Sequence, residues 1–324
     1  MIVSSSLPHA VLPATVPLAG RALVFGGGGA TGNAWLVGVV AGLAEAGLDV
    51  LDADLTIGTS AGSTAAAQFT AAAPAELYAA AIAGSGSGSG SARPSGRSQA
   101  GPRPPMTDHL AAFQAVIASS ADAADMRRRM GAAALAADDG TDAGGDAARS
   151  ARWSETVAAR LGGARWPDRR MLITAVDART GEPVTFERDS GVDLVDAVAA
   201  SCAGGAFAYA IGDGRYIDGG YRSFAENADL AAGYERVLVL SPLGGMSRYP
   251  EEWGLSLATQ VAALRAGGSR VEVIAPDAED AHLFANPTDF TLRVPAAHAG
   301  RAQGMALPAR LEDFWGSSAA PADA

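Results

Sequence analysis

The feature that most constrains the fold is a glycine-flanked serine between a predicted strand and a predicted helix. Residues 55–57 are apolar or β-branched, as in a buried strand, and residues 61–69 are small or helix-favouring. Gly58 and Gly62 flank Ser60 in the pattern Gly-x-Ser-x-Gly, which in a sharp strand-to-helix turn exposes the serine hydroxyl. The pattern predicts Ser60 as a nucleophile. The alternative is that the small residues only let a helix pack on a strand.

A glycine-rich loop precedes this segment. Residues 21–25 are typical of a strand, and a helix is predicted from about residue 33 to residue 46. Between them, Gly27, Gly29 and Gly32 satisfy the pattern Gly-x-Gly-x-x-Gly. The order strand, loop, helix, strand, turn, helix predicts an α/β fold with a mainly parallel sheet and chemistry at the carboxyl ends of its strands.

Such a loop has two possible uses. Its backbone amides can hold a pyrophosphate or the oxyanion of an acyl-transfer intermediate, because both need unhindered N–H groups near negative charge. A dinucleotide site also needs an acid after the second strand, whereas Asp49 and Asp52 come before it. The neighbouring serine favours the oxyanion use, with Gly27, Gly28 and Gly29 as donors. A nucleotide-binding α/β protein remains the alternative from another functional class.

A candidate general base ends a later predicted strand, residues 212–218. Gly219 and Gly220 follow Asp218 and leave its carboxylate exposed at the strand end, where we expect the same sheet edge as for Ser60. A carboxylate deprotonates a serine poorly unless a partly desolvated site raises its pKa, so we expect Asp218 to be largely buried. The alternative is a turn-forming Asp-Gly at a hairpin tip.

Together these motifs resemble the patatin-like phospholipase family of bacteria. The likeness covers roughly residues 23–227, with residues 27–32 as oxyanion loop, residues 58–62 as elbow and Asp218 with its two glycines as acid motif. It implies a three-layer α/β/α sandwich and a lipid acyl hydrolase that cleaves carboxylic esters. It further implies a Ser60–Asp218 dyad without catalytic histidine, metal or organic cofactor, and residues 227–229 as support for the acid motif.

Two positions depart from the family pattern. Thr31 stands where many members carry a basic residue, so the loop amides must stabilise the oxyanion without a cation from this position. Residues 203–207 lack the proline that is common in a turn that often shapes the acyl pocket. The resemblance therefore does not carry over acyl chain length or head group.

The histidines offer a competing enzyme hypothesis. An α/β-hydrolase triad has the chain order serine, acid, histidine. His282 and His298 follow Asp218 in that order, whereas His9 and His109 precede it. The glycine loop one strand before the elbow argues against this triad, because that fold places more sheet before its elbow.

The rest of the chain continues the alternation of strands and helices. Further strands are predicted at residues 171–176, 184–186, 236–241 and 270–275. Further helices are predicted at residues 74–83, 107–118, 121–137, 193–201, 255–266 and 299–314. Residues 242–253 form a loop with apolar side chains, which either admits an acyl chain or only packs on the domain.

One catalytic domain is predicted over residues 21–315. Residues 1–20 are predicted to be a flexible arm and residues 316–324 a frayed end. Low-complexity stretches at about 84–105 and 138–149 bound an insertion that is either a lid over the serine or surface padding.

Composition excludes some partners. The net charge of -11, from 24 basic and 35 acidic residues, argues against nucleic acid and against docking on anionic lipid by charge alone. The single cysteine, Cys202, cannot form an intramolecular disulfide and is expected to be buried. The longest apolar run, residues 34–44, is shorter than the roughly 20 residues that cross a bilayer. We therefore expect a cytoplasmic protein, with at most transient contact with a membrane surface.

Overall fold

The computed structural model describes residues 18–83, 106–137, 145–205 and 207–316. Most of the predicted arm and of the predicted frayed end lies outside these residues. The low-complexity stretch at 84–105 and residues 138–144 also lie outside them.

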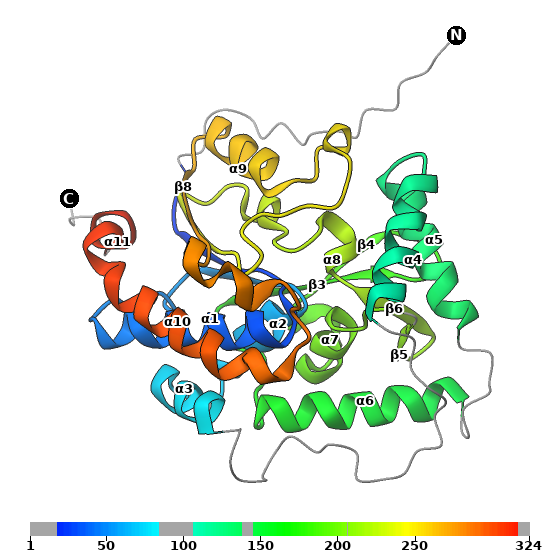
Figure 1. The fold of residues 1–324 in the computed structure, drawn as a ribbon, viewed down its shortest axis with the longest axis horizontal. Coiled ribbons are helices and arrows are strands. Elements are labelled where there is room, and N and C mark those ends of the chain that lie inside the picture. Colours follow the sequence, from blue (N-terminus) through cyan, green and yellow to red (C-terminus); the bar gives the residue numbers. More distant parts are fainter. Residues whose placement is uncertain (1–17, 84–105, 138–144, 206, 317–324) are drawn as a thin grey trace.

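A mixed, mostly parallel sheet forms the centre of an α/β fold (Figure 1). The eight strands follow the order β5-β6-β3-β2-β1-β7-β8, with β4 paired to β3. Strands β3, β2, β1, β7 and β8 are parallel, whereas β4, β5 and β6 pair in antiparallel fashion. The predicted fold class is confirmed at this level. The strands are β1 (Arg21–Phe25), β2 (Leu55–Gly58), β3 (Arg170–Asp177), β4 (Pro183–Phe186), β5 (Tyr209–Ile211), β6 (Gly214–Asp218), β7 (Arg236–Leu240) and β8 (Arg270–Ile274).

Helices connect the strands and cover the sheet. They are α1 (Gly29–Glu45), α2 (Ala61–Gln68), α3 (Pro74–Ala83), α4 (Met106–Ser119), α5 (Ala123–Ala136), α6 (Gly145–Leu161), α7 (Leu194–Ser201), α8 (Gly220–Ser223), α9 (Leu257–Ala266), α10 (Arg293–Ala306) and α11 (Pro308–Trp315). Within the described ranges, no helix is both long enough and apolar enough to cross a membrane.

Strand residues alternate between two hydrophobic clusters, as the two-residue period of a strand requires. In β1, Leu23 and Phe25 join the cluster that includes α1, α7 and α10. Ala22 and Val24 join a second cluster, which includes Leu257 and other residues of α9. The continuous apolar runs of the central strands follow from this burial on both sides.

Helix α1 is buried on all sides from Thr31 to Leu43, whereas the sequence predicted a single apolar face. Helix α10 lies alongside it (Figure 1). A Cβ at Gly38 would overlap the Ala297 carbonyl oxygen, and one at Gly300 would overlap the Trp35 carbonyl oxygen. Glycines on both helices therefore allow the backbones to approach closely.

Helix α6 was missed by the sequence analysis, which assigned its first residues to a low-complexity stretch. The signal was present, because Trp153, Val157 and Leu161 recur at a spacing of four and pack against the first cluster. Strand β5 was also not predicted.

The predicted helix at residues 299–314 is wrong in its extent. Helix α10 begins earlier, at Arg293, and ends at Ala306, and Pro308 begins α11. Proline lacks the N–H of a helix interior but fits the first helical position, so it separates the two helices.

Helices α4 and α5 lie at one end of the molecule, next to β5 and β6 (Figure 1). Ile117 of α4 and Met126 of α5 are buried in a third hydrophobic cluster, together with Val176 and Ile217 of the sheet. Tyr249, from the loop between β7 and α9, belongs to the same cluster. This packing brings segments that are distant in sequence to the antiparallel end of the sheet.

Candidate active site

Ser60 occupies the turn between β2 and α2 in a strained backbone conformation, with φ 51° and ψ −116°. Its N–H donates to Ser201 Oγ at 2.9 Å, and Ser63 Oγ donates to its carbonyl oxygen at 2.6 Å. A Cβ at Gly62 would overlap the Phe25 carbonyl oxygen, so β1 lies directly against the turn. The predicted elbow has the strain and the close packing that its glycines indicated.

Asp218 lies directly beside Ser60. Ser60 Oγ donates to Asp218 Oδ2 at 2.8 Å, and the Gly220 N–H donates to Oδ1 at 2.7 Å. Both carboxylate oxygens are therefore held in place. A Cβ at Gly219 would overlap the Thr174 hydroxyl, and one at Gly58 would lie 2.6 Å from a backbone atom of α2. Each of these glycines permits an approach that a side chain would prevent.

Strand β6 brings Asp218 to Ser60 in a way that the sequence did not predict. It runs antiparallel to β3 and pairs Asp218 with Ala175, while parallel β2 pairs Gly58 with Ile173. Because Ala175 lies just beyond Ile173, Asp218 comes level with the serine just beyond Gly58. The acid reaches the site through register and not through a shared carboxyl edge. The hairpin-tip alternative is wrong, because the turn between β5 and β6 lies at the other end of β6.

The Asp218 carboxyl is a stronger base than an exposed aspartate. Burial raises its pKa from 3.8 to about 6, and the hydrogen bonds from Gly220 and Ser60 limit the rise because they favour the carboxylate. Protein surrounds the carboxyl group closely, although the residue keeps partial exposure towards the cavity beside it. A group with this pKa is mostly ionised at neutral pH and can accept a proton from serine.

The glycine loop offers fewer free amides than predicted. The Gly27 N–H donates to the Ala225 carbonyl at 2.9 Å, so this predicted oxyanion donor is already occupied. Within the described residues, the N–H groups of Gly28 and Gly29 have no backbone acceptor, and Gly28 lines the cavity at Ser60. The amide of Ala61, at the first position of α2, also lacks an acceptor there. The residue after the nucleophile is a usual oxyanion donor in such elbows.

Two backbone amides at the start of α1 already bind carbonyl groups, which argues against the nucleotide-binding alternative. The Thr31 N–H donates to the Pro287 carbonyl at 3.2 Å, and the Gly32 N–H donates to the Gly28 carbonyl at 2.8 Å. A Cβ at Gly29 would overlap the Pro287 carbonyl oxygen. A phosphate bound at a helix N-terminus needs these amides, so the loop is poorly arranged for it. The Thr31 hydroxyl is buried without a hydrogen-bond partner.

A buried amide side chain, Asn227, connects the elbow to the acid motif. Its Nδ2 donates to Thr59 Oγ1 at 2.9 Å and to the Gly219 carbonyl at 3.1 Å. Thr174 Oγ1 of β3 donates to the same Thr59 hydroxyl at 3.0 Å. The residues on either side of the Ser60–Asp218 pair are thereby tied to one another, as the resemblance implied for residues 227–229.

An ion pair anchors this amide from the other side. Ser223 Oγ and Arg222 Nη1 donate to Asn227 Oδ1 at 2.6 and 2.9 Å. Arg222 also pairs with both carboxylate oxygens of Asp229, at 2.8 and 2.7 Å. This fork geometry fixes the guanidinium, which in turn fixes the orientation of the amide.

Helix α7 ends beneath the elbow and supplies two groups that sequence reasoning did not assign to the site. Besides Ser201, the Cys202 thiol donates to the Ser60 carbonyl at 3.1 Å. Burial, together with the charge of Asp218, raises the pKa of this thiol to about 11, so it stays neutral and acts as a donor. Although the thiol is enclosed by protein, the residue as a whole is partly exposed, whereas the sequence predicted a buried residue.

A second carboxylic acid lies beneath the glycine loop. Glu226 is 1% exposed, and its Oε1 accepts a hydrogen bond from Ser241 Oγ at 2.6 Å. A Cβ at Gly26 would lie 3.4 Å from the Glu226 side chain. Burial raises the pKa of Glu226 to about 7, while the hydrogen bond from Ser241 limits the rise.

A cavity of about 210 Å³ opens at the dyad, and Ser60 and Asp218 both line it. The loop predicted at residues 242–253 contributes Leu243 and Tyr249, so it reaches the site. The remaining lining residues are Gly27, Gly28, Thr59, Phe113, Gly204, Gly220, Tyr221, Phe224 and Ala225.

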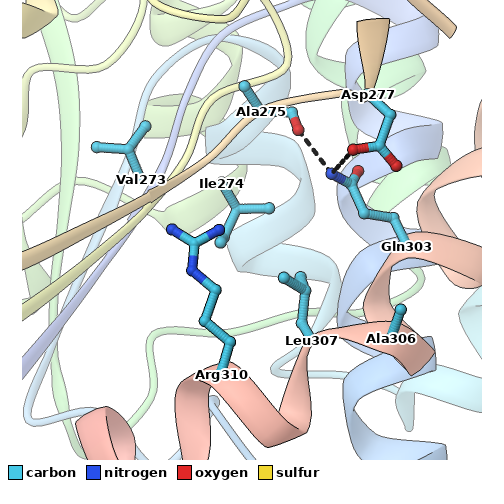
Figure 2. A pocket seen from close by; sticks show the side chains of 8 residues that line it. All are labelled: Val273, Ile274, Ala275, Asp277, Gln303, Ala306, Leu307 and Arg310. Atoms are coloured by element: carbon cyan, nitrogen blue, oxygen red, sulfur yellow. Dashed lines mark hydrogen bonds between the residues drawn. The ribbon is translucent and has the colours of Figure 1, made fainter. Parts of the chain in front are cut away.

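A larger cavity of about 320 Å³ lies elsewhere, between the end of β8 and helices α10 and α11 (Figure 2). On one side of it, Gln303 Nε2 donates to the Ala275 carbonyl at 2.7 Å and to Asp277 Oδ1 at 3.1 Å. Arg310, on the opposite side in Figure 2, pairs with Glu272 at 2.5 Å. The polar side chains that line this cavity are already paired with other protein groups, so size alone does not make it the functional site.

Neither of the two described histidine side chains that follow Asp218 in the chain, His282 and His298, joins the dyad. Nδ1 of His298, on α10, lies 2.7 Å from the Tyr78 hydroxyl, and Nδ1 of His282 lies 2.9 Å from the Glu279 carbonyl oxygen. The Asp218 carboxylate is instead bonded to Ser60 and Gly220. No group of His, Cys, Asp and Glu in the described parts of the chain is arranged to hold a metal ion.

The strain at Ser60 predicts an unusual order of stabilities. We expect Ser60→Gly to be more stable than Ser60→Ala by about 1 kcal/mol in urea unfolding, because glycine adopts the positive φ without strain. At Thr64, inside α2, Thr64→Ala should instead be more stable than Thr64→Gly by about the same amount, because alanine is the better helix former. Equal preference for alanine at both positions would contradict strain at the elbow.

The buried Glu226 carboxyl predicts a pH-dependent stability difference. Its folded pKa lies above its ordinary value of 4.5, so its stabilising contribution is full below that value and is lost as the pH rises through about 7. The free energy of unfolding of Glu226→Gln should therefore exceed that of wild type by about 1–3 kcal/mol near pH 8, and this difference should shrink towards about pH 4.5. Exposed Glu252→Gln is the control, and a pH-independent gap would count against the prediction.

No protein-family model matches the chain, and no curated protein matches it.

Proposed function

We propose that the protein is a patatin-like serine hydrolase that cleaves carboxylic esters through a Ser60–Asp218 dyad. The observation that carries the proposal is the 2.8 Å hydrogen bond from Ser60 Oγ to Asp218 Oδ2 at a strained elbow. A hydroxyl that is already bonded to a carboxylate of raised pKa can transfer its proton as it attacks a carbonyl. The cavity beside both groups leaves room for the substrate.

In the first step, Ser60 Oγ forms a bond to the ester carbonyl carbon and its proton moves to Asp218. The π electrons of the carbonyl move onto its oxygen, and the amides of Gly28 and Ala61, unpaired within the described residues, are the proposed donors to this oxyanion. When the tetrahedral intermediate collapses, the bond to the alcohol oxygen breaks, and that oxygen takes the proton from Asp218. The products of this step are a free alcohol and an acyl-serine.

In the second step, water attacks the acyl-serine carbonyl and gives a proton to Asp218. The second tetrahedral intermediate breaks its bond to Ser60 Oγ, which recovers the proton from Asp218. A carboxylic acid leaves, and the dyad returns to its initial state. The carboxylate is thus the base in the first half of each step and the acid in the second half.

The resemblance also implies a particular layering of helices on the sheet. We propose a three-layer α/β/α sandwich, with α1, α7 and α10 on one side of the sheet and α9 on the other. The support is the alternation of β1 residues between two clusters that contain these helices. The proposed substrate is the carboxylic ester of a lipid or of a soluble alcohol.

The dyad is tested by hydrolysis of p-nitrophenyl butyrate. Ser60→Ala and Asp218→Asn should each lower kcat/KM by at least about 10³-fold, because each removes one half of the proton transfer. The His282→Ala/His298→Ala double variant should stay within about twofold of wild type. Circular dichroism controls for folding.

The outcomes separate the rival functions. Loss of activity in the histidine double variant would contradict the dyad and favour a Ser-Asp-His triad. If wild type hydrolyses no ester, calorimetric titration with NAD, FAD or ATP tests the nucleotide-binding alternative.

The raised pKa of Asp218 predicts the pH dependence of the reaction. Activity needs the carboxylate, so kcat/KM should fall below an apparent pKa of about 6 and stay level above it to about pH 9. Glu226→Gln distinguishes the two buried acids, because it should leave this midpoint in place. A midpoint near 7 that disappears in Glu226→Gln would assign the titration to Glu226 instead.

A further inference from the structure

The cavity at the dyad is walled by aromatic rings. Phe113 of α4, Tyr221, Phe224 and Tyr249 all line it. The ring centroid of Phe113 lies 5.9 Å from that of Tyr221 and 6.2 Å from that of Tyr249, and the Phe224 and Tyr249 centroids are 5.6 Å apart. These are contact distances for aromatic pairs, so the rings form a continuous wall.

Hydrogen bonds fix two of these rings. The Tyr249 hydroxyl donates to the Gly220 carbonyl at 3.1 Å, and the Tyr221 hydroxyl accepts the Gly205 N–H at 3.2 Å. Tyr249 is 6% exposed and also contacts the Trp253 ring at a centroid distance of 5.8 Å. Tyr249 is thus anchored to the backbone of the acid motif, and Tyr221 to the loop after α7.

The volume limits what fits between these rings. At about 210 Å³, the cavity is larger than the roughly 150 Å³ that accommodates benzene and smaller than the roughly 300 Å³ at which sites for drug-sized ligands begin. A single aromatic ring or a short aliphatic chain therefore fits within the cavity, whereas a long extended chain would have to reach beyond its rings into solvent.

We propose that the dyad acts on esters of small acyl groups, either short-chain or single-ring, and discriminates against long-chain acyl groups. The inference rests on the proposed function of Ser60 and Asp218 and narrows its substrate class. The acyl group is the part that the cavity must hold, because it stays bonded to Ser60 Oγ between the two steps while the alcohol departs.

Phe113 sets the length limit. It reaches the cavity from α4, whereas Tyr221 and Phe224 come from the segment that follows β6. Its ring contacts both tyrosines, so its truncation to alanine would enlarge the cavity on the side of α4 without touching the dyad. A larger ring at this position fills the cavity instead.

The test compares p-nitrophenyl acetate, butyrate, hexanoate, decanoate, palmitate and benzoate as monomeric substrates. For wild type, kcat/KM should be highest among the esters from acetate to hexanoate and the benzoate, and should fall by at least about 10²-fold for palmitate. Esters of butyrate with varied alcohols should differ less than esters with varied acyl groups.

Variants at position 113 shift the limit in both directions. Phe113→Ala should raise the ratio of decanoate to butyrate activity by about tenfold, because each accommodated methylene adds binding to the transition state. Phe113→Trp should lower the ratio of hexanoate to acetate activity. Phe207→Ala is the matched control, since this partly buried ring also contacts two other aromatic rings but lies outside the cavity lining. Its ratios should equal those of wild type.

The outcomes distinguish failure of the inference from failure of the proposed function. Hydrolysis of palmitate at or above the rate of butyrate, with loss of both activities in Ser60→Ala, would overturn the acyl limit and leave the dyad in place. Unchanged ratios in both Phe113 variants would also overturn it. If no ester is cleaved and a small fluorophosphonate does not label Ser60, the proposed function fails and the inference fails with it.

Discussion

The strained backbone of Ser60 is the constraint on which the site depends. A non-glycine residue keeps a backbone φ of 51° only where surrounding contacts hold it in that conformation. Here the Ser60 N–H and carbonyl are held by Ser201, Ser63 and Cys202, and Gly62 lets β1 pack against the turn. The same contacts that store the strain also aim Oγ at Asp218, so the geometry of the dyad follows from the packing of α2, α7 and β1.

Asp218 balances two opposing effects. Burial disfavours its charge, whereas hydrogen bonds from Ser60 and Gly220 favour it, and burial has the larger effect. A fully exposed carboxylate would be too weak a base, and one without donors would bind a proton at neutral pH. The network through Asn227 and Thr59 fixes the segments that carry both Ser60 and Asp218, so this balance does not depend on one mobile group.

Local signals in the sequence were sufficient for the central strands, the elbow and the acid motif. Ser60 and Asp218 could be predicted because glycines flank them at a fixed spacing in the sequence. Long-range facts could not be found in this way. The antiparallel register of β6, the use of the Gly27 amide by Ala225, and the approach of Ser201 to Ser60 depend on pairings between distant segments. Helix α6 did have a local signal, but its first residues were assigned to a low-complexity stretch. The break at Pro308 also had one, but a single helix was predicted across it.

Gly220 connects the chemistry with the shape of the cavity. Its N–H holds Asp218 Oδ1, and its carbonyl accepts the Tyr249 hydroxyl, so the base and one wall of the cavity share a single peptide segment. Tyr249 in turn packs on Phe113 of α4 and on Phe224. A substrate group that pushed this wall outwards would therefore also displace the donor that orients the base. Because interiors are close-packed and resist small displacements, the proposed discrimination against large acyl groups would act through both steric exclusion and the orientation of Asp218.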